Sequence, residues 1–342
     1  MSNQLVIVLI TFTVTSLGAF ANCLAYYSAK KLPTMNSSFG LITKNQAICN
    51  TIVCCMFLFL IIPMQLNISQ NLIKYSYFVG IWATSIYDIS NESHLFIAMN
   101  RFCAVFFPSY YEKIFTIPFT KIVRNIIWIT AFIKCTILYD ILECYFIFYP
   151  EYWTFAYIDT AECSAMNWYT DFVFNNSLVA ITLCTNLLTA YKAGKTNRML
   201  MNSAGVRMTK QQRQREINFI KQSFFQGTSI FAGQVTYYLI APFFENVILL
   251  FILSAFWAFM HAAEGGIILA SNQEMRAVWR KKKSLFEKSI RDRISTSFRQ
   301  TDVDLCHKWN HCISFKCGLP VICPLFFKIT YDHLYYLGFA FV

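Results

Sequence analysis

Charged residues are scarce in this sequence. Asp, Glu, Lys and Arg make up 14% of its 342 residues, whereas a soluble chain of this length carries about a quarter. Hydrophobic residues account for 56% of the chain, and Phe alone occurs 34 times. This balance excludes an ordinary soluble domain and predicts a membrane protein.

Histidine is also rare, and its rarity argues against an enzyme. The chain has 5 His, and only His94 and His261 fall inside apolar segments. No cluster with metal-ligand spacing joins these two residues. We therefore expect no catalytic residues, no metal and no cofactor, and a seven-span zinc hydrolase is the weakest of the functional hypotheses.

A secreted disulfide framework and a nucleic-acid surface are missing as well. Many of the 13 Cys lie inside apolar runs, where Cys behaves as a small hydrophobic residue. The formal net charge of +11 is spread between and after the apolar segments rather than gathered in one soluble patch. Nucleic acid is therefore not an expected partner.

Apolar segments separated by short polar loops dominate the chain instead. A helix needs about 20 largely apolar residues to cross the hydrocarbon core of a membrane. We predict seven spans, at residues 5–28, 40–64, 77–107, 123–148, 170–193, 217–241 and 247–270. The expected fold is an all-α, seven-transmembrane helix bundle over residues 1–270, followed by an amphipathic helix on the membrane surface at 271–298 and a cytosolic tail at 299–342.

Lys and Arg lie almost entirely on one side of this arrangement. The loops after spans one, three and five are basic, most densely over 192–215, whereas the opposite side carries only Lys74. Because basic loops face the cytosol, we expect an outer N-terminus, a multi-pass protein of the plasma membrane, and contact between the basic tail and acidic lipids. The sequon at Asn67 is then an outer glycosylation candidate, and the one at Asn36 lies inside.

One polar pair interrupts the third apolar run. The stretch NRFCAVFFPSYY, which begins at Asn100, resembles the D/E-R-Y motif that ends the third helix of rhodopsin-like G-protein-coupled receptors. Arg101, Pro108 and Tyr111 follow the family's spacing, and Asn100 stands where the family usually has an acid. Further stretches resemble other landmarks in the same order: ANCLA, KKLPTMNSSFG, NQAICN, Trp128 and SNQEMRAVW.

Longer stretches of the sequence resemble one subfamily of these receptors. The stretches FGLITKNQAICN, YDISNESHLFIAMNRFCAVFFP and EGGIILASNQEMR resemble nematode serpentine chemoreceptors of class X. The resemblance implies a chemosensory receptor that binds a small molecule outside and activates a heterotrimeric G protein at a cytosolic crevice around Arg101. Location in sensory cilia and assembly into receptor oligomers are left open.

The resemblance also assigns residues to the coupling machinery. These are Asn22, Asn50, Asn100, Arg101, Pro108, Tyr111 and Glu264. Three of them depart from the family: Asn100, which stands at the acid position, and two others. Asn50 replaces an Asp, so a sodium site of the usual acidic kind is not expected, and Glu264 stands at the Asn position of N-P-x-x-Y, either as a switch or as a buried hydrogen-bonding group. Without an acid beside Arg101, we expect the contact that holds Arg101 in the inactive state to be weaker or to use another partner.

Polar residues within the spans are the ligand-binding candidates. They are Asp88, Asn91, Glu92, Asn176, Gln234, Tyr237 and Tyr238. The first three share one helical face at i, i+3 and i+4, and they either contact ligand or bond to neighbouring helices. Lys134 is a possible ionic partner of Asp88 because buried charges in membranes pair.

The outer loop over 149–169 is rich in aromatic residues and has no Lys or Arg. It either caps a pocket for a small apolar or neutral molecule or lies on the lipid headgroups. The family's amine-binding Asp would fall near Ala83 and its retinal-binding Lys near Ala258, which disfavours an aminergic receptor and an opsin. Cys144 and Cys163 lie near the outer face, where we expect a disulfide.

One functional alternative remains. A seven-span transporter or ligand-gated channel for small molecules would need helix breaks near mid-membrane or a water-filled polar path, and only span three is polar enough for such a path. Transporters are often built from repeated halves, and no internal repeat is visible. Ligand-evoked current without a G protein would favour this alternative.

Overall fold

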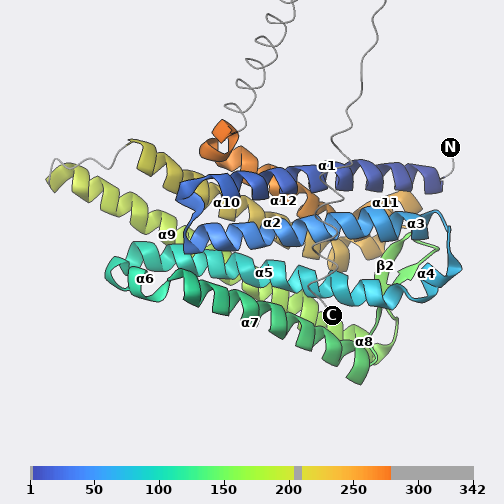
Figure 1. The fold of residues 1–342 in the computed structure, drawn as a ribbon. Coiled ribbons are helices and arrows are strands. Elements are labelled where there is room, and N and C mark those ends of the chain that lie inside the picture. The colour runs from blue at the N-terminus through green and yellow to red at the C-terminus, as the bar shows by residue number, and fades with distance from the viewer. Residues whose placement is uncertain (1–2, 204–209, 279–342) are drawn as a thin grey trace, which may run out of the picture. The chain divides into compact units, whose positions relative to one another are not determined.

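Long helices that run side by side make up most of the protein (Figure 1). The computed structural model describes residues 3–203 and 210–278, and it describes side chains in these ranges except at 195–221 and 223. The described residues belong to one unit, Met1–Ser284. The α-helices are α1 Asn3–Lys31, α2 Ser38–Met56, α3 Ile62–Gln65, α4 Gln70–Lys74, α5 Ser76–Phe106, α6 Pro108–Ile114, α7 Ile117–Thr136, α8 Ala161–Asn167, α9 Phe174–Ser203, α10 Lys210–Val235, α11 Val247–Ser254 and α12 Phe256–Ser271.

Short stretches of other structure extend or join these helices. They are the 3₁₀ turns η1 Pro33–Met35 and η6 Ala241–Phe243, the π-helical turns η2 Phe57–Ile61, η3 Ile137–Ile141, η4 Trp168–Val173 and η5 Thr236–Ile240, and the strands β1 Phe146–Tyr149 and β2 Thr154–Tyr157. The strands pair antiparallel, with Phe146 opposite Tyr157 and Tyr149 opposite Thr154. We call the end of the bundle that carries this hairpin the hairpin end; α3, α4 and the N-terminus lie there, and α6 lies at the opposite end, the α6 end (Figure 1).

Polar side chains begin several of the helices. The Ser37 hydroxyl accepts the Gly40 amide at the start of α2, and the Thr116 hydroxyl accepts the Phe119 amide at the start of α7. Asn246 accepts the Leu249 amide in the same way before α11. Such caps satisfy amides that have no partner within the helix. They fix where each helix starts after a short loop.

Not every helix is apolar enough to be identified as a span by composition. In the described part of the chain, four segments pass on length and hydropathy: Asn3–Lys31, Ser38–Gln65, Ile117–Ile141 and Ala161–Gly194. The pair α11 and α12, bent by 54°, makes a fifth if it is one span. Helix α5 has 31 residues, about 46 Å at 1.5 Å per residue, but it carries Asp88, Glu92 and Arg101. The predicted third and sixth spans, 77–107 and 217–241, lie on α5 and α10, which do not pass this test.

Two predicted boundaries are wrong. The fourth span was expected to run to residue 148, but its helix begins at Ile117 and ends in η3, and residues 146–149 form β1. An apolar run such as CYFIFY fits a buried strand as well as a helix, and Glu143, with a φ of 50°, turns the chain between them. The hairpin also corrects the expectation of an all-α fold. The fifth helical segment is longer than 170–193, because it begins at Ala161 and reaches Ser203.

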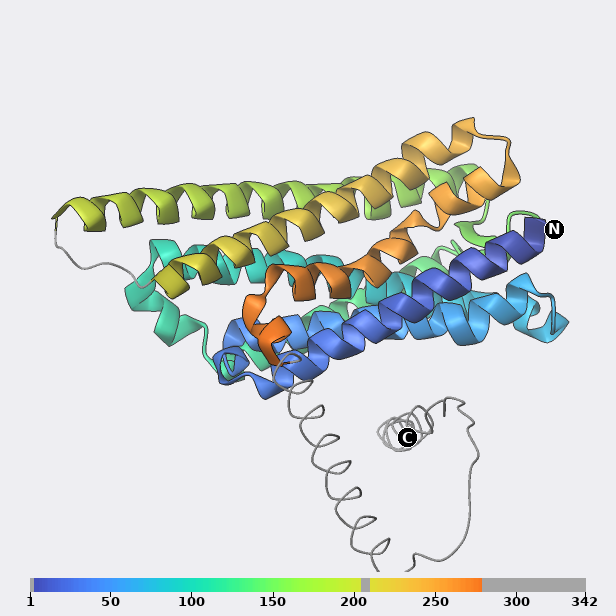
Figure 2. The same ribbon diagram turned by 90° about the horizontal axis from the view of Figure 1, so that it is seen from above.

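Helix α5 lies at the centre of the packing. It contacts α2, α7, α9 and α10 along its length and β1 at the hairpin end. Helices α9 and α10 run side by side, as Figure 2 shows from above. Buried polar groups on α5 therefore find partners on neighbouring helices, as Asp88 does with Lys134 of α7 and His94 with Glu264 of α12.

Helices α1 and α12 approach each other closely at two glycines. A Cβ on Gly265 would fall 2.5 Å from the Asn22 amide nitrogen, and one on Gly18 would collide with Ala262. Small residues let helix backbones pack at short distance inside a membrane. This approach brings the polar groups of α12 to the middle of the bundle.

The predicted surface helix and tail lie mostly outside the described residues. Residues 273–278 are helical. The remainder of the predicted helix at 271–298, the tail at 299–342 and most of the basic loop side chains over 192–215 lie outside the part of the chain that the structure describes.

Candidate functional site

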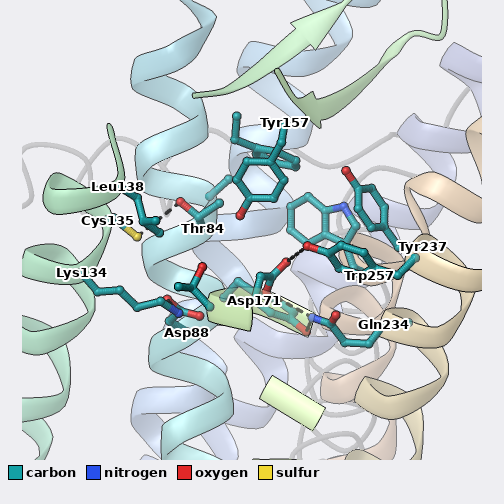
Figure 3. A pocket seen from close by; sticks show the side chains of 16 residues that line it. Thr84, Asp88, Lys134, Cys135, Leu138, Tyr157, Asp171, Gln234, Tyr237 and Trp257 are labelled. Atoms are coloured by element: carbon teal, nitrogen blue, oxygen red, sulfur yellow. Dashed lines mark hydrogen bonds and ion pairs between the residues drawn. The ribbon is translucent and has the colours of Figure 1, made fainter. Parts of the chain in front are cut away.

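A small cavity lies near the hairpin end, between α5, α7, η4, α10 and α12. Figure 3 shows Asp171 among the side chains that line it, with Asp88, Lys134 and Gln234 below and around it and Tyr157 and Trp257 above it. Its volume is about 40 Å³, room for roughly three water molecules. The hairpin covers its outer side through Phe146 and Tyr157.

Asp171, in the π-helical turn η4, is the hub of the cavity. The Tyr238 hydroxyl donates to Oδ2 of Asp171 at 2.6 Å, and the Asn175 amide donates to Oδ1 at 2.6 Å. Nε2 of Gln234 donates to the same Oδ1 at 3.4 Å and to the Tyr87 hydroxyl at 2.5 Å. One carboxylate thus ties the start of α9 to α10 and η5.

Asp88 and Lys134 form a second pair in the cavity wall. Nζ of Lys134 lies 2.9 Å from Oδ2 of Asp88, so the ionic partner suggested from the sequence is the one the structure provides. Asp88 is only 4% exposed. Asn175 reaches its Oδ1 at 3.5 Å and so connects Asp88 with Asp171.

Tyr157 of β2 keeps its proton at the top of the cavity. Burial of its ring and the nearby Asp171 carboxylate raise the pKa of Tyr157 well above its ordinary value. A neutral phenol remains a hydrogen-bond donor at physiological pH. The hairpin therefore presents a donor and an aromatic face to the cavity rather than a charge.

The ligand candidates from the sequence divide into two groups. Asp88, Gln234, Tyr237 and Tyr238 line the cavity. Asn91, Glu92 and Asn176 do not. Asn91 donates to Asn175 at 3.0 Å, Glu92 is only half-buried on α5, and Asn176 donates to the carbonyl of Phe172 in its own helical segment at 2.7 Å.

Sequence reasoning missed Asp171. The residue falls inside the predicted fifth span, next to its outer edge, and the spacing i, i+4 to Asn175 was the available signal, since such pairs share a helical face.

A second polar network lies deeper in the bundle and joins α2, α5 and α12. Nε2 of His94 lies 2.9 Å from Oε1 of Glu264, and the Asn50 amide donates to Oε2 of Glu264 at 2.6 Å. Gln46 bonds the other ring nitrogen of His94 at 2.8 Å, and His261 bonds Oδ1 of Asn50 at 2.8 Å. All five side chains are buried.

Helix α1 closes this network through Asn22. Its amide donates to the carbonyl of His261 at 3.0 Å and to that of Gly18 at 2.9 Å. The sequence pointed to Asn22, Asn50 and Glu264 but not to Gln46 or His261. Gln46 precedes Asn50 by four residues and His261 precedes Glu264 by three, so the members of each pair share one face of their helix.

At the α6 end, Asn100 and Arg101 bind the start of α2. The Asn100 amide donates to the Ser38 hydroxyl at 2.9 Å, and the Tyr111 hydroxyl donates to Oδ1 of Asn100 at 3.4 Å. The guanidinium carbon of Arg101 lies 3.8 Å from the ring centroid of Phe39, a cation–π contact. Asn100, in the acid's place, thus bonds to α2 and α6, and Pro108 is the first residue of α6.

The hairpin end carries the two predicted outer features. Cys144 and Cys163 form a disulfide with their Cα atoms 5.3 Å apart, the pairing expected from the sequence. Asn67 is exposed in the turn between α3 and α4, and its side-chain oxygen Oδ1 accepts a hydrogen bond from Nε2 of Gln70 at 2.8 Å.

Comparison with known proteins identifies the family. Residues 12–272 match the family described as "Serpentine type 7TM GPCR chemoreceptor Srx". Serpentine receptor class X 45 of Caenorhabditis elegans is 26% identical over 292 residues, which cover 80% of each chain. Serpentine receptor class X-43 of the same organism is 25% identical over 259 residues, 72% of this chain and 77% of the relative. The chain therefore belongs to the Srx family of serpentine chemoreceptors.

Proposed function

We propose that this protein is a seven-pass chemosensory receptor of the plasma membrane, in the cilia of sensory neurons. Its N-terminus lies outside, a small molecule binds in the cavity around Asp171, and a heterotrimeric G protein docks at the α6 end. Membership of a chemoreceptor family supports the receptor role.

The positions of the disulfide and of the basic residues along the bundle support this orientation. The N-terminus, the Cys144–Cys163 disulfide and Asn67 lie at the hairpin end. Lys30 and Lys31 end α1 at the α6 end. Disulfides form in oxidising space outside the cytosol, and Lys and Arg collect on the cytosolic side.

The observation that carries the proposal is the path of α5. This helix holds Asp88 in the cavity, His94 in the buried network and Arg101 at the α6 end. Asp88 and Arg101 are 13 positions apart, about 20 Å along a helix. A displacement of α5 against α10 or α12 at the cavity therefore reaches the coupling residues through one rigid element.

The cavity is closed around its own side chains in this conformation. A molecule larger than a few waters must displace Tyr238 or Gln234 from Asp171, and these two residues lie on η5 and α10. Ligand binding would then favour a state in which α10 moves away from α5, to the extent that the ligand binds that state more tightly. Release of Arg101 from Phe39 would open the crevice for the G-protein α subunit.

The test is a G-protein activation assay in cells, with a screen of volatile and soluble small molecules as the stimulus. Arg101→Ala should abolish ligand-evoked activation at matched surface expression. Arg124→Ala is the matched control, because Arg124 is a half-exposed arginine on α7 that bonds to its neighbour Asn125. Undiminished signalling from Arg101→Ala would overturn the role given to Arg101.

A further inference from the structure

The charges around the cavity do not balance. Lys134 is paired with Asp88, whereas the side chains that donate hydrogen bonds to Asp171 in the described part of the chain, Tyr238, Asn175 and Gln234, are neutral. Across the described residues, no Lys, Arg or His forms an ion pair with Asp171. The cavity wall therefore carries one carboxylate in excess of its cations.

One acceptor in the wall also has no donor. Gln234 is 4% exposed, and its Oε1 is buried without a hydrogen-bond partner among the described residues. The orientation of this amide is set by Asp171, because a carboxylate accepts and Nε2 must face it. A buried acceptor without a donor is costly, so Oε1 is suited to a donor that arrives with a ligand.

Aromatic rings form the rest of the surface around Asp171. Tyr157, Tyr237 and Trp257 are gathered on its hairpin side in Figure 3, and all three line the cavity. Trp257 packs edge-on against Tyr87 at 6.0 Å and Phe146 at 6.2 Å between ring centroids. Ring faces attract cations and repel anions, most strongly where water is excluded.

We infer that this cavity recognises a small organic cation, a protonated amine whose ammonium group sits between Asp171 and Oε1 of Gln234. An ammonium group has N–H donors for both acceptors and no acceptor of its own. It also neutralises the excess carboxylate, which an alcohol or amide cannot do and a carboxylate ligand would aggravate. The cavity of about 40 Å³ has room for the ammonium group itself, and the apolar chain of the amine would displace Tyr238 and lie against the rings.

This site is built differently from an amine site at the family's usual position. That position falls at Ala83, which lines the cavity but has no charge. The carboxylate comes instead from η4, across the cavity from α5. The inference rests on the proposed receptor function for its meaning, but the binding chemistry stands on these side chains alone.

The test measures binding without any G protein. The full chain is purified in lipid nanodiscs, and saturation-transfer NMR compares butylamine with its neutral isostere n-butanol and with the anion butyrate, at millimolar concentrations. Empty nanodiscs give the background of partition into lipid. We expect butylamine to bind at least about tenfold more tightly than n-butanol and butyrate to show no binding.

Variants of one residue separate charge from packing. Asp171→Asn should abolish the preference for butylamine over n-butanol, Asp171→Glu should retain it, and Asp159→Asn, a change at an exposed acid of the outer loop, should leave it unchanged. If Asp171→Asn fails to fold, wild type and Asp171→Glu still decide the question. Equal binding of amine and alcohol by wild type, including no binding of either, would overturn the inference.

The outcome is also distinguishable from failure of the proposed function. An amine preference without G-protein activation would count against coupling and leave the cation site standing. G-protein activation by molecules that carry no positive charge, together with equal binding of amine and alcohol, would leave the receptor standing and remove the cation site.

Discussion

His94 of α5 and Glu264 of α12 face each other in the buried middle of the bundle, with 2.9 Å between Nε2 and Oε1. The pair connects the helix that carries Asp88 and Arg101 to the helix that carries Trp257 of the cavity wall. Asn50 bonds the other oxygen of the same carboxylate. The acid that rhodopsin-like receptors usually have in the second span is thus replaced here by an acid on α12, with Asn50 as its partner.

Removal of Glu264 should destabilise the bundle. Glu264→Ala leaves His94 and Asn50 buried without their partner, and loss of one member of a buried pair costs about 3–5 kcal/mol. We expect a lower thermal midpoint for the purified receptor and reduced surface expression. Glu112→Ala, a change at an exposed acid on α6, is the control; equal midpoints for both variants would contradict the structural role of the pair.

Loss of the ring beneath Arg101 should raise basal signalling. Phe39→Leu removes a cation–π contact worth about 0.5–1 kcal/mol, so the resting state loses stability relative to the active one. Basal G-protein activation should rise about two- to fivefold, since each 1.4 kcal/mol is about a tenfold change in an equilibrium. Phe102→Leu is the matched control, because Phe102 stacks on Phe106 at 4.3 Å. Unchanged basal activity in Phe39→Leu would show that the contact between Phe39 and Arg101 does not hold the receptor in its resting state.

The outer disulfide should be detectable and stabilising. Peptides that contain Cys144 and Cys163 should be recovered linked from the non-reduced receptor by mass spectrometry. Their bridge closes a loop of about 20 residues, so replacement of both by Ser should cost about 3 kcal/mol of unfolding free energy. Cys184→Ser, at an exposed free thiol, should cost far less. Recovery of Cys144 and Cys163 alkylated without reduction would contradict the pairing.

Glycosylation should report the orientation. Asn67 is exposed at the hairpin end, so the receptor from animal cells should lose mass on treatment with an N-glycosidase, and Asn67→Gln should abolish that loss. Asn36→Gln should leave it unchanged, because Asn36 lies at the α6 end of α1 and α2. A glycan on Asn36 would reverse the proposed topology.

The sequence predicted those features of the fold that depend on hydropathy over many residues or on the pairing of buried charges. Hydropathy over about 20 residues predicted where the helices lie, and the rule that buried charges pair identified Lys134 as the partner of Asp88. Alternation and hydropathy do not separate a short buried strand from a helix, so residues 146–148 of β1 were assigned to the fourth span.

The site was less predictable because its residues meet only through tertiary packing. His94 and Glu264 are 170 positions apart, and no local pattern reports their contact. Asp171 becomes a hub only because η4 and η5 bring Asn175 and Tyr238 to its two oxygens. The residue types were visible in the sequence, but their partners were not.

Nucleotide exchange on purified G proteins tests the central claim most directly. The receptor is reconstituted in nanodiscs with heterotrimers that represent the different classes of α subunit, and exchange is compared with empty nanodiscs. The account predicts faster exchange on one class with wild type and with Arg124→Ala, and the rate of empty nanodiscs with Arg101→Ala. Exchange at the empty-nanodisc rate with wild type on every class, together with a small-molecule-evoked current in cells without G protein, would contradict the account and favour a channel.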